Sequence, residues 1–116
     1  MKIIQVTDIH LTPHGTELYG LNPNKRLEAC IASITEHHSD AEFCIFTGDL
    51  TDGGDPDAYN DFRNIIQNLS MPYYPLIGNH DHRDIFCEVF PQVPRDEHGF
   101  VQQMLKTTVG HFLLLD

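Results

Sequence analysis

Short apolar segments alternate with segments of helical periodicity along most of this chain, and this alternation restricts the fold more than any other feature. The three apolar segments have the length and the β-branched or aromatic composition of strands, and they are residues 2–7, 43–47 and 73–77. Each segment between them opens on a capping residue followed by proline, Asn22-Pro23 in the first and Asp55-Pro56 in the second. The order strand, helix, strand, helix, strand predicts an α/β fold, in which a parallel sheet is joined by right-handed crossovers.

Apolar residues recur at the spacing of one helical face in both intervening segments. They are Leu27, Cys30, Ile31 and Ile34 in the first segment, and Tyr59, Phe62, Ile65, Ile66 and Leu69 in the second. The first helix is expected to end near residues 37–38. Farther along, residues 83–90 predict a short helix. Residues 100–104 and 109–115 predict two strands that pair across residues 106–108.

Each of the three predicted strands leads into residues that can bind a metal ion. The strands are followed by Asp8 and His10, by Gly48 and Asp49, and by Gly78, Asn79, His80 and Asp81. Because the carboxyl ends of parallel strands share one edge of a sheet, these residues are expected to converge. One Asp or Asn after a strand is more often a turn or cap residue, so the prediction depends on all three loops together. Mixed imidazole, carboxylate and amide ligands favour Mn, Fe, Co or Zn over Ca or Mg.

The charge and the cysteines restrict partners and location. With 7 Lys and Arg against 17 Asp and Glu, the formal net charge is −10, which disfavours a nucleic-acid groove or an anionic membrane surface. No apolar run is long enough to span a membrane. The three cysteines, Cys30, Cys44 and Cys87, are scattered and form no C-x-x-C motif, which indicates reduced thiols and a cytoplasmic location. Without an internal repeat or a linker, residues 1–116 are expected to form a single domain.

The motifs TDIH at 7–10, GDLTDGG at 48–54 and GNHD at 78–81 resemble those of the metallophosphoesterase (calcineurin-like) superfamily in order and spacing. Within it, TDIHL followed by LYGLNP is similar to the bacterial class III cyclic-nucleotide phosphodiesterases and their glycerophosphodiesterase relatives. It is less similar to the protein Ser/Thr phosphatases, whose middle motif continues into Asp-Arg-Gly. The resemblance implies that the chain is the βαβαβ parallel-sheet half of the αββα sandwich of this superfamily.

The resemblance also implies a binuclear-metal phosphodiesterase. Its substrates would be small phosphodiesters, cyclic nucleotides or glycerophosphodiesters, hydrolysed by attack of a hydroxide that bridges two ions chosen from Mn, Fe, Co or Zn. Asp8 and His10 would bind the first ion, and Asp49 would bridge both. Asn79 would bind the second ion and, with His80, the substrate phosphate. His80 would be the catalytic residue that stabilises or protonates the leaving oxygen. Asp81 would orient His80 or serve as a turn or cap residue.

The superfamily pattern continues with further histidine ligands for which this sequence has no equivalent. His111 follows a glycine, but position 113 is Leu where a second histidine is needed. We therefore expect the 116 residues to be an incomplete catalytic domain, either the first half of a longer enzyme or a degraded copy. The alternative functions are an inactive truncated copy and a non-catalytic scaffold of the same fold. An open sheet edge further suggests a homo-oligomer.

Overall fold

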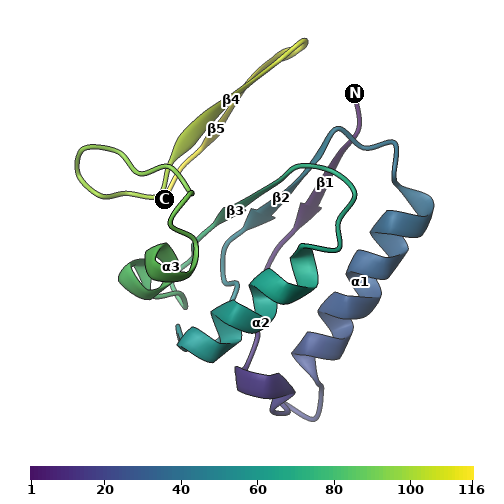
Figure 1. Cartoon of the computed structure of the whole chain (residues 1–116), viewed down its shortest axis with the longest axis vertical. Coiled ribbons are helices and arrows are strands. Elements are labelled where there is room, and N and C mark those ends of the chain that lie inside the picture. The colour runs from purple at the N-terminus through teal and green to yellow at the C-terminus, as the bar shows by residue number, and fades with distance from the viewer.

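The computed structural model describes residues 1–116 and consists of a three-stranded parallel sheet, two helices packed on it, a short third helix and a hairpin (Figure 1). The elements are β1 (Ile3–Val6), the 3-10 turn η1 (Pro13–Gly15), α1 (Pro23–His37), β2 (Phe43–Thr47), α2 (Pro56–Ile66), β3 (Tyr73–Leu76), α3 (Arg83–Val89), β4 (Gln103–Thr107) and β5 (Gly110–Leu114). β2 lies between β1 and β3 and pairs in parallel with both. The α/β class and the βαβαβ order are therefore confirmed.

Both long helices begin as predicted. The side chain of Asn22 accepts a hydrogen bond from the Lys25 backbone N–H, and Pro23 starts α1. The side chain of Asp55 accepts in the same way from the Asp57 backbone N–H, at the start of α2. Each cap satisfies a backbone donor that has no partner inside its own helix, so the residue that opens each helix is determined locally.

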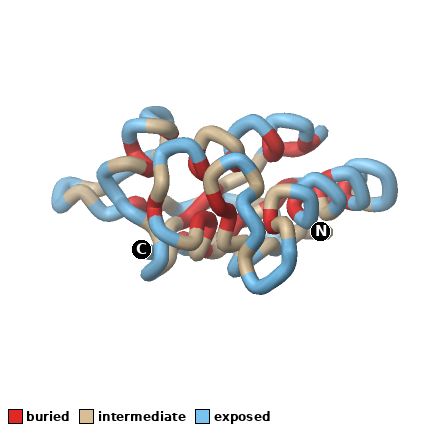
Figure 2. Tube along the Cα trace, turned by 90° about the horizontal axis from the view of Figure 1, so that it is seen from below, coloured by how far each residue is buried: buried red, intermediate tan, exposed pale blue.

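The core lies between one face of the sheet and the two long helices. Alternate residues of β2, Cys44 and Phe46, are fully buried on this face. The ring of Phe46 meets the ring of Phe62 of α2 edge-on, with centroids 5.1 Å apart. Both predicted helical stripes supply core residues, although Cys30 is only partly buried and Leu69 lies beyond the end of α2. Figure 2 shows the buried residues in the middle of the molecule, with exposed segments around them.

The C-terminal hairpin differs from its prediction. Its first strand is Gln103–Thr107, and residues 100–102 do not belong to it. The reason is that the carboxylate of Asp96 accepts hydrogen bonds from the backbone N–H groups of His98 and Phe100, which holds this segment in a turn. β4 and β5 form a separate antiparallel sheet, attached to the body where the rings of Phe112 and Phe43 meet with centroids 5.5 Å apart.

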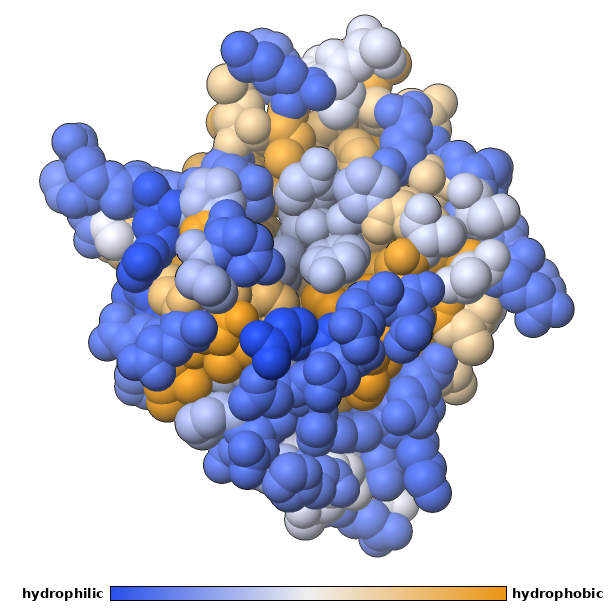
Figure 3. All heavy atoms as spheres, viewed as in Figure 1, coloured by the Kyte–Doolittle hydropathy of each residue, from blue (hydrophilic) through white to orange (hydrophobic).

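The second face of the three-stranded sheet is only partly covered. Ile3, Gln5 and Ile45 point to this face and are half-buried or exposed, and Gln5 donates a hydrogen bond to the Thr47 hydroxyl. β1 and β3 are the outer strands, so the sheet has two open edges, and self-association remains a prediction. On the side of the molecule seen in Figure 1, hydrophilic side chains predominate and apolar atoms are visible between them (Figure 3). No helix has the length and apolar character that crossing a membrane requires.

Candidate metal centre

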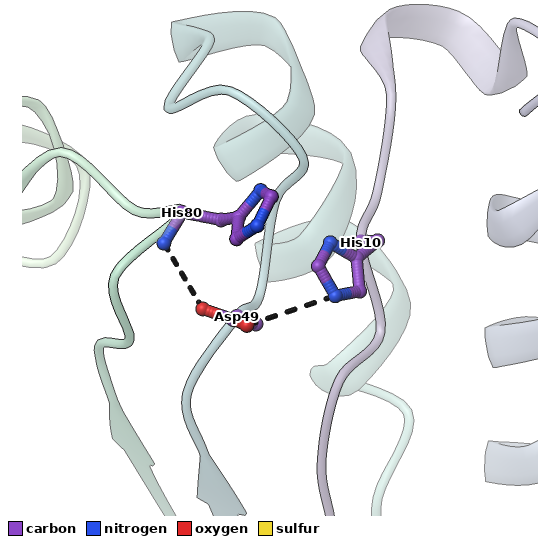
Figure 4. A group of neighbouring side chains, drawn as sticks. All are labelled: His10, Asp49 and His80. Atoms are coloured by element: carbon purple, nitrogen blue, oxygen red, sulfur yellow. Dashed lines mark hydrogen bonds and ion pairs between the residues drawn. The ribbon is translucent and has the colours of Figure 1, made fainter.

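The loops that follow β1, β2 and β3 meet at one edge of the sheet (Figure 4). His10 comes from the first loop, Asp49 from the second and His80 from the third. The Nε2 atom of His10 lies 3.7 Å from an oxygen of Asp49, and the backbone N–H of His80 donates to the other oxygen at 3.0 Å. One ligand atom of each residue lies within 4.8 Å of the others, and their imidazole and carboxylate groups fit a transition-metal ion.

The two ring nitrogens of His10 face different partners. Nε2 lies 4.0 Å from Asp8 Oδ1 and 3.7 Å from Asp49 Oδ2, so it points to the place where carboxylates would share an ion. Nδ1 is buried and makes no hydrogen bond, and the nearest carboxylate oxygen, Asp52 Oδ1, lies 3.3 Å away. In many metal sites a carboxylate at this second nitrogen orients the histidine, and Asp52 lies where it could do so after a small adjustment. Asp52 is therefore a functional candidate that the sequence did not single out.

The loop after β2 holds His80 and also faces His10, in both cases through Asp52. The Nδ1 atom of His80 lies 2.9 Å from the carbonyl oxygen of Asp52, and the His80 ring meets that of His10 edge-on at 4.7 Å between centroids. Because a carbonyl only accepts, Nδ1 carries the proton and Nε2 remains available. This hydrogen bond raises the pKa of His80, and the charges of Asp49 and Asp52 add to the effect, while desolvation opposes it.

The two other predicted ligands lie at the rim of the cluster. Asp8 has one oxygen 4.0 Å from His10 Nε2, and its other oxygen accepts a hydrogen bond from the Thr7 hydroxyl. Asn79 is exposed and borders a cavity that Arg83 and Asp116 also line. The structure thus gathers His10, Asp49 and His80 most closely, although His80 is expected outside the metal shell. His111 lies opposite Lys106 on the hairpin and does not belong to the cluster.

Glycines allow the second and third loops to touch. A Cβ atom on Gly78 would overlap the carboxylate and the backbone nitrogen of Asp49. A Cβ atom on Gly54 would come within 2.6 Å of the Cβ of His82. Only residues without a side chain permit this close approach, which sets the distance between Asp49 and the histidine loop.

The carboxylate of Asp81 makes no hydrogen bond or ion pair with the ring of His80, so its expected role in orienting that ring is not observed. Its carboxylate instead accepts hydrogen bonds from the second loop, from its own loop and from the hydroxyl of Tyr59 in α2. Tyr59 is fully buried, and burial raises the pKa of its hydroxyl far above the ordinary value, which keeps the proton on this donor.

Comparison with known proteins identifies the family. Residues 1–112 match the model of the calcineurin-like phosphoesterase family. A probable cyclic nucleotide phosphodiesterase of Rhodopseudomonas palustris is 40% identical over 116 residues, which are 100% of this chain and 42% of that protein. A probable glycerophosphodiester phosphodiesterase of Arcobacter nitrofigilis is 34% identical over 85 residues, 72% of this chain and 31% of that protein. A 3',5'-cyclic adenosine monophosphate phosphodiesterase of Escherichia coli is 33% identical over 82 residues, 70% of this chain and 30% of that protein.

The chain therefore belongs to the calcineurin-like phosphoesterase family. It spans less than half the length of each of these three relatives, which agrees with the expectation of a half-domain.

Proposed function

We propose that this chain supplies the first part of the active site of a metal-dependent phosphodiesterase. The observation that carries the proposal is the meeting of His10, Asp49 and His80, from three loops, within 4.8 Å. Membership of a phosphoesterase family supports hydrolysis of a phosphate ester. Relatives named cyclic nucleotide and glycerophosphodiester phosphodiesterases support small diesters as the substrate class.

We propose two metal ions, drawn from Mn, Fe, Co or Zn, as the cofactors. In this proposal Asp8 and His10 would hold one ion, Asn79 would hold the other, and Asp49 would hold both. The mixed nitrogen and oxygen donors support transition metals. Two ions held there would supply positive charge for the phosphoryl oxygens and would make a water molecule more acidic.

His80 is the proposed catalytic residue, acting on the phosphate together with Asn79. Its ring points from the third loop toward His10 (Figure 4), and the Asp52 carbonyl holds its Nδ1. In its protonated form, His80 would donate from Nε2 to a phosphate oxygen and would stabilise or protonate the leaving oxygen.

An apolar cavity beside Asp8 supports a cyclic nucleotide over a glycerophosphodiester. Its volume is about 370 Å³, and it lies between the end of β1, residues 18–21 and the start of α1. The lining is mainly apolar and includes Val6, Leu18, Leu21 and Leu27. A nucleobase buries more apolar surface against such a wall than a glycerol group does.

We also propose a cytoplasmic location, with which the free thiols of all three cysteines are compatible.

The test measures Mn(II) binding and Mn(II)-dependent hydrolysis of bis(p-nitrophenyl) phosphate by this chain. Asp49→Ala is expected to abolish both, and Asp84→Ala, at an exposed position of α3, to change neither. Binding without hydrolysis would favour the scaffold or the inactive copy, and absence of Mn(II) binding would overturn the proposal. His80→Ala is expected to retain the metal and lose hydrolysis, whereas loss of the metal would place His80 among the ligands.

A further inference from the structure

The carboxylate of Asp81 accepts five hydrogen bonds, which come from three parts of the chain. Oδ1 accepts from the backbone N–H of Thr51 at 3.0 Å, from the Thr51 hydroxyl at 3.1 Å and from the Tyr59 hydroxyl at 3.0 Å. Oδ2 accepts from the backbone N–H of Leu50 at 3.0 Å and from that of Gly78 at 2.8 Å. Every partner is a donor, so both oxygens are used as acceptors.

The first and second loops are joined in a different way. The backbone pairing of β1 and β2 continues beyond the strands, since Asp8, His10 and Leu11 donate their N–H groups to carbonyls of residues 48–50 at 3.2, 2.9 and 2.9 Å. The pairing of β2 with β3 ends at Thr47 and Leu76, and no backbone-to-backbone hydrogen bond joins residues 48–54 to residues 77–82. Side chains make all the hydrogen bonds between those two loops.

We propose that Asp81 is a positioning residue, whose carboxylate replaces the missing backbone pairing between the second and third loops. Leu50 directly follows Asp49 in the sequence, and Gly78 directly precedes Asn79. Oδ2 binds the N–H groups of both Leu50 and Gly78, so one oxygen atom fixes the distance between the two proposed ligand positions. The inference rests on the proposed metal centre, because this distance matters for function only when both loops bind an ion.

Tyr59 connects this carboxylate to the core. Its hydroxyl donates to Asp81 and accepts from the backbone N–H of His82 at 2.8 Å. Tyr59 belongs to α2, and its side chain is fully buried in the core. The two loops therefore hold a fixed position relative to α2 as well as to each other.

An amide cannot replace the carboxylate at this position. In either orientation of an Asn side chain, its NH₂ group would face at least two of the five donors, and the hydrogen bonds there would be lost. The substitution Asp81→Asn keeps the size of the side chain but removes its charge and part of its capacity to accept hydrogen bonds. Groups that orient metal ligands through hydrogen bonds change the metal affinity by about 10–100-fold when they are mutated.

The experiment compares Asp81→Asn with Asp84→Asn, which removes the same charge three residues away from an exposed side chain that makes no hydrogen bond. Mn(II) affinity is measured by electron paramagnetic resonance, and thermal unfolding is measured on the metal-free protein. We expect Asp81→Asn to weaken Mn(II) binding by about 10–100-fold and Asp84→Asn to leave it unchanged. If Asp81→Asn lowered only the unfolding temperature and kept the wild-type affinity, Asp81 would be merely structural and the inference overturned.

Two further measurements keep the test decisive. Hydrogen exchange of the His80 amide in the metal-free protein reports the bond to Asp49 Oδ1, which joins the same loops without involving Asp81. Faster exchange in Asp81→Asn would support the inference, and unchanged exchange would overturn it. If the wild type binds no Mn(II), the proposed function fails, but the exchange measurement still tests the role of Asp81.

If Asp81→Asn does not fold, Tyr59→Phe removes one donor and keeps the carboxylate. A few-fold loss of affinity is then expected, and wild-type affinity would overturn the inference.

Discussion

Three residues of the candidate metal centre have a backbone conformation that side chains disfavour. The φ angles of Asp8, His10 and Asp49 are 54°, 50° and 49°, in the left-handed region. Such a conformation costs on the order of 1–3 kcal/mol per residue and persists only where the surrounding structure enforces it. Here the hydrogen bonds between the first two loops enforce it, so part of the stability of the fold is used to orient these side chains.

At the scale of one residue, Asp8→Gly is expected to stabilise the metal-free protein by about 1 kcal/mol, because glycine adopts the left-handed region without strain. The Asp8 side chain is 64% exposed and accepts only the hydroxyl of Thr7, so its removal costs little. Chemical denaturation measures the free energy of unfolding. The matched control is Asp8→Ala, which removes the same carboxylate and keeps the strain, and equal stabilities of the two variants would contradict the explanation.

At the scale of elements, the loops after β2 and β3 approach so closely that only glycine fits where they meet. Gly48 and Gly78 pack against each other, and a Cβ on Gly48 would lie 3.0 Å from the Cα of Gly78. The spacing of the two loops is therefore set by missing side chains as well as by the Asp81 carboxylate.

Gly78→Ala is expected to push the Asp49 carboxylate out of place, because the new methyl group would overlap it. The overpacking should destabilise the protein by about 1–3 kcal/mol and weaken Mn(II) binding at the same time. Thermal unfolding and metal titration of the same samples measure both effects. Gly53→Ala is the control, since a Cβ there meets no atom within 4 Å. Wild-type metal affinity in Gly78→Ala would show that the loop spacing does not control the site.

At the scale of the whole molecule, one ion pair joins the residue that follows the hairpin to the start of α3. Arg83, at the start of α3, donates to both carboxylate oxygens of Asp116 at 2.7 and 2.8 Å and lies over the ring of Phe100. Asp116 also accepts from the backbone N–H of Val101. The hairpin therefore keeps its position through this carboxylate as well as through the contact of Phe112 with Phe43.

The hydrogen bond from Arg83 lowers the pKa of Asp116 below its ordinary value of 3.8. A carboxyl group with a lowered folded-state pKa stabilises the fold above its unfolded-state pKa, and this stabilisation is lost as the pH falls through the folded-state pKa. We expect stability to decline below about pH 4, with the hairpin loosening first. Asp116→Asn should be less stable at pH 7 and lose less between pH 5 and pH 2, as measured by denaturation at each pH. An unchanged acid response would show that this ion pair does not hold the hairpin.

Much of the fold could be predicted because it depends on nearby residues. The bounds of β2 and the start of α1 follow from an apolar run and from a cap with proline, and both are confirmed. The predicted start of β4, at residue 100, was wrong because the side chain of Asp96 binds backbone N–H groups that a strand would use. Such binding depends on how a turn closes, which apolar periodicity does not report.

The amino-acid sequence alone determined the order of elements and the edge of the sheet where the ligand-type residues gather, since strand direction follows from the βαβ order. Only the tertiary structure decided that Asp52 faces His10 and that Asp81 binds the second loop rather than His80. These roles depend on which polar groups the three loops and α2 bring within 3.3 Å of a carboxylate. That distance is set by glycine contacts and by a buried tyrosine distant in the sequence, so the residues beside each aspartate do not reveal it.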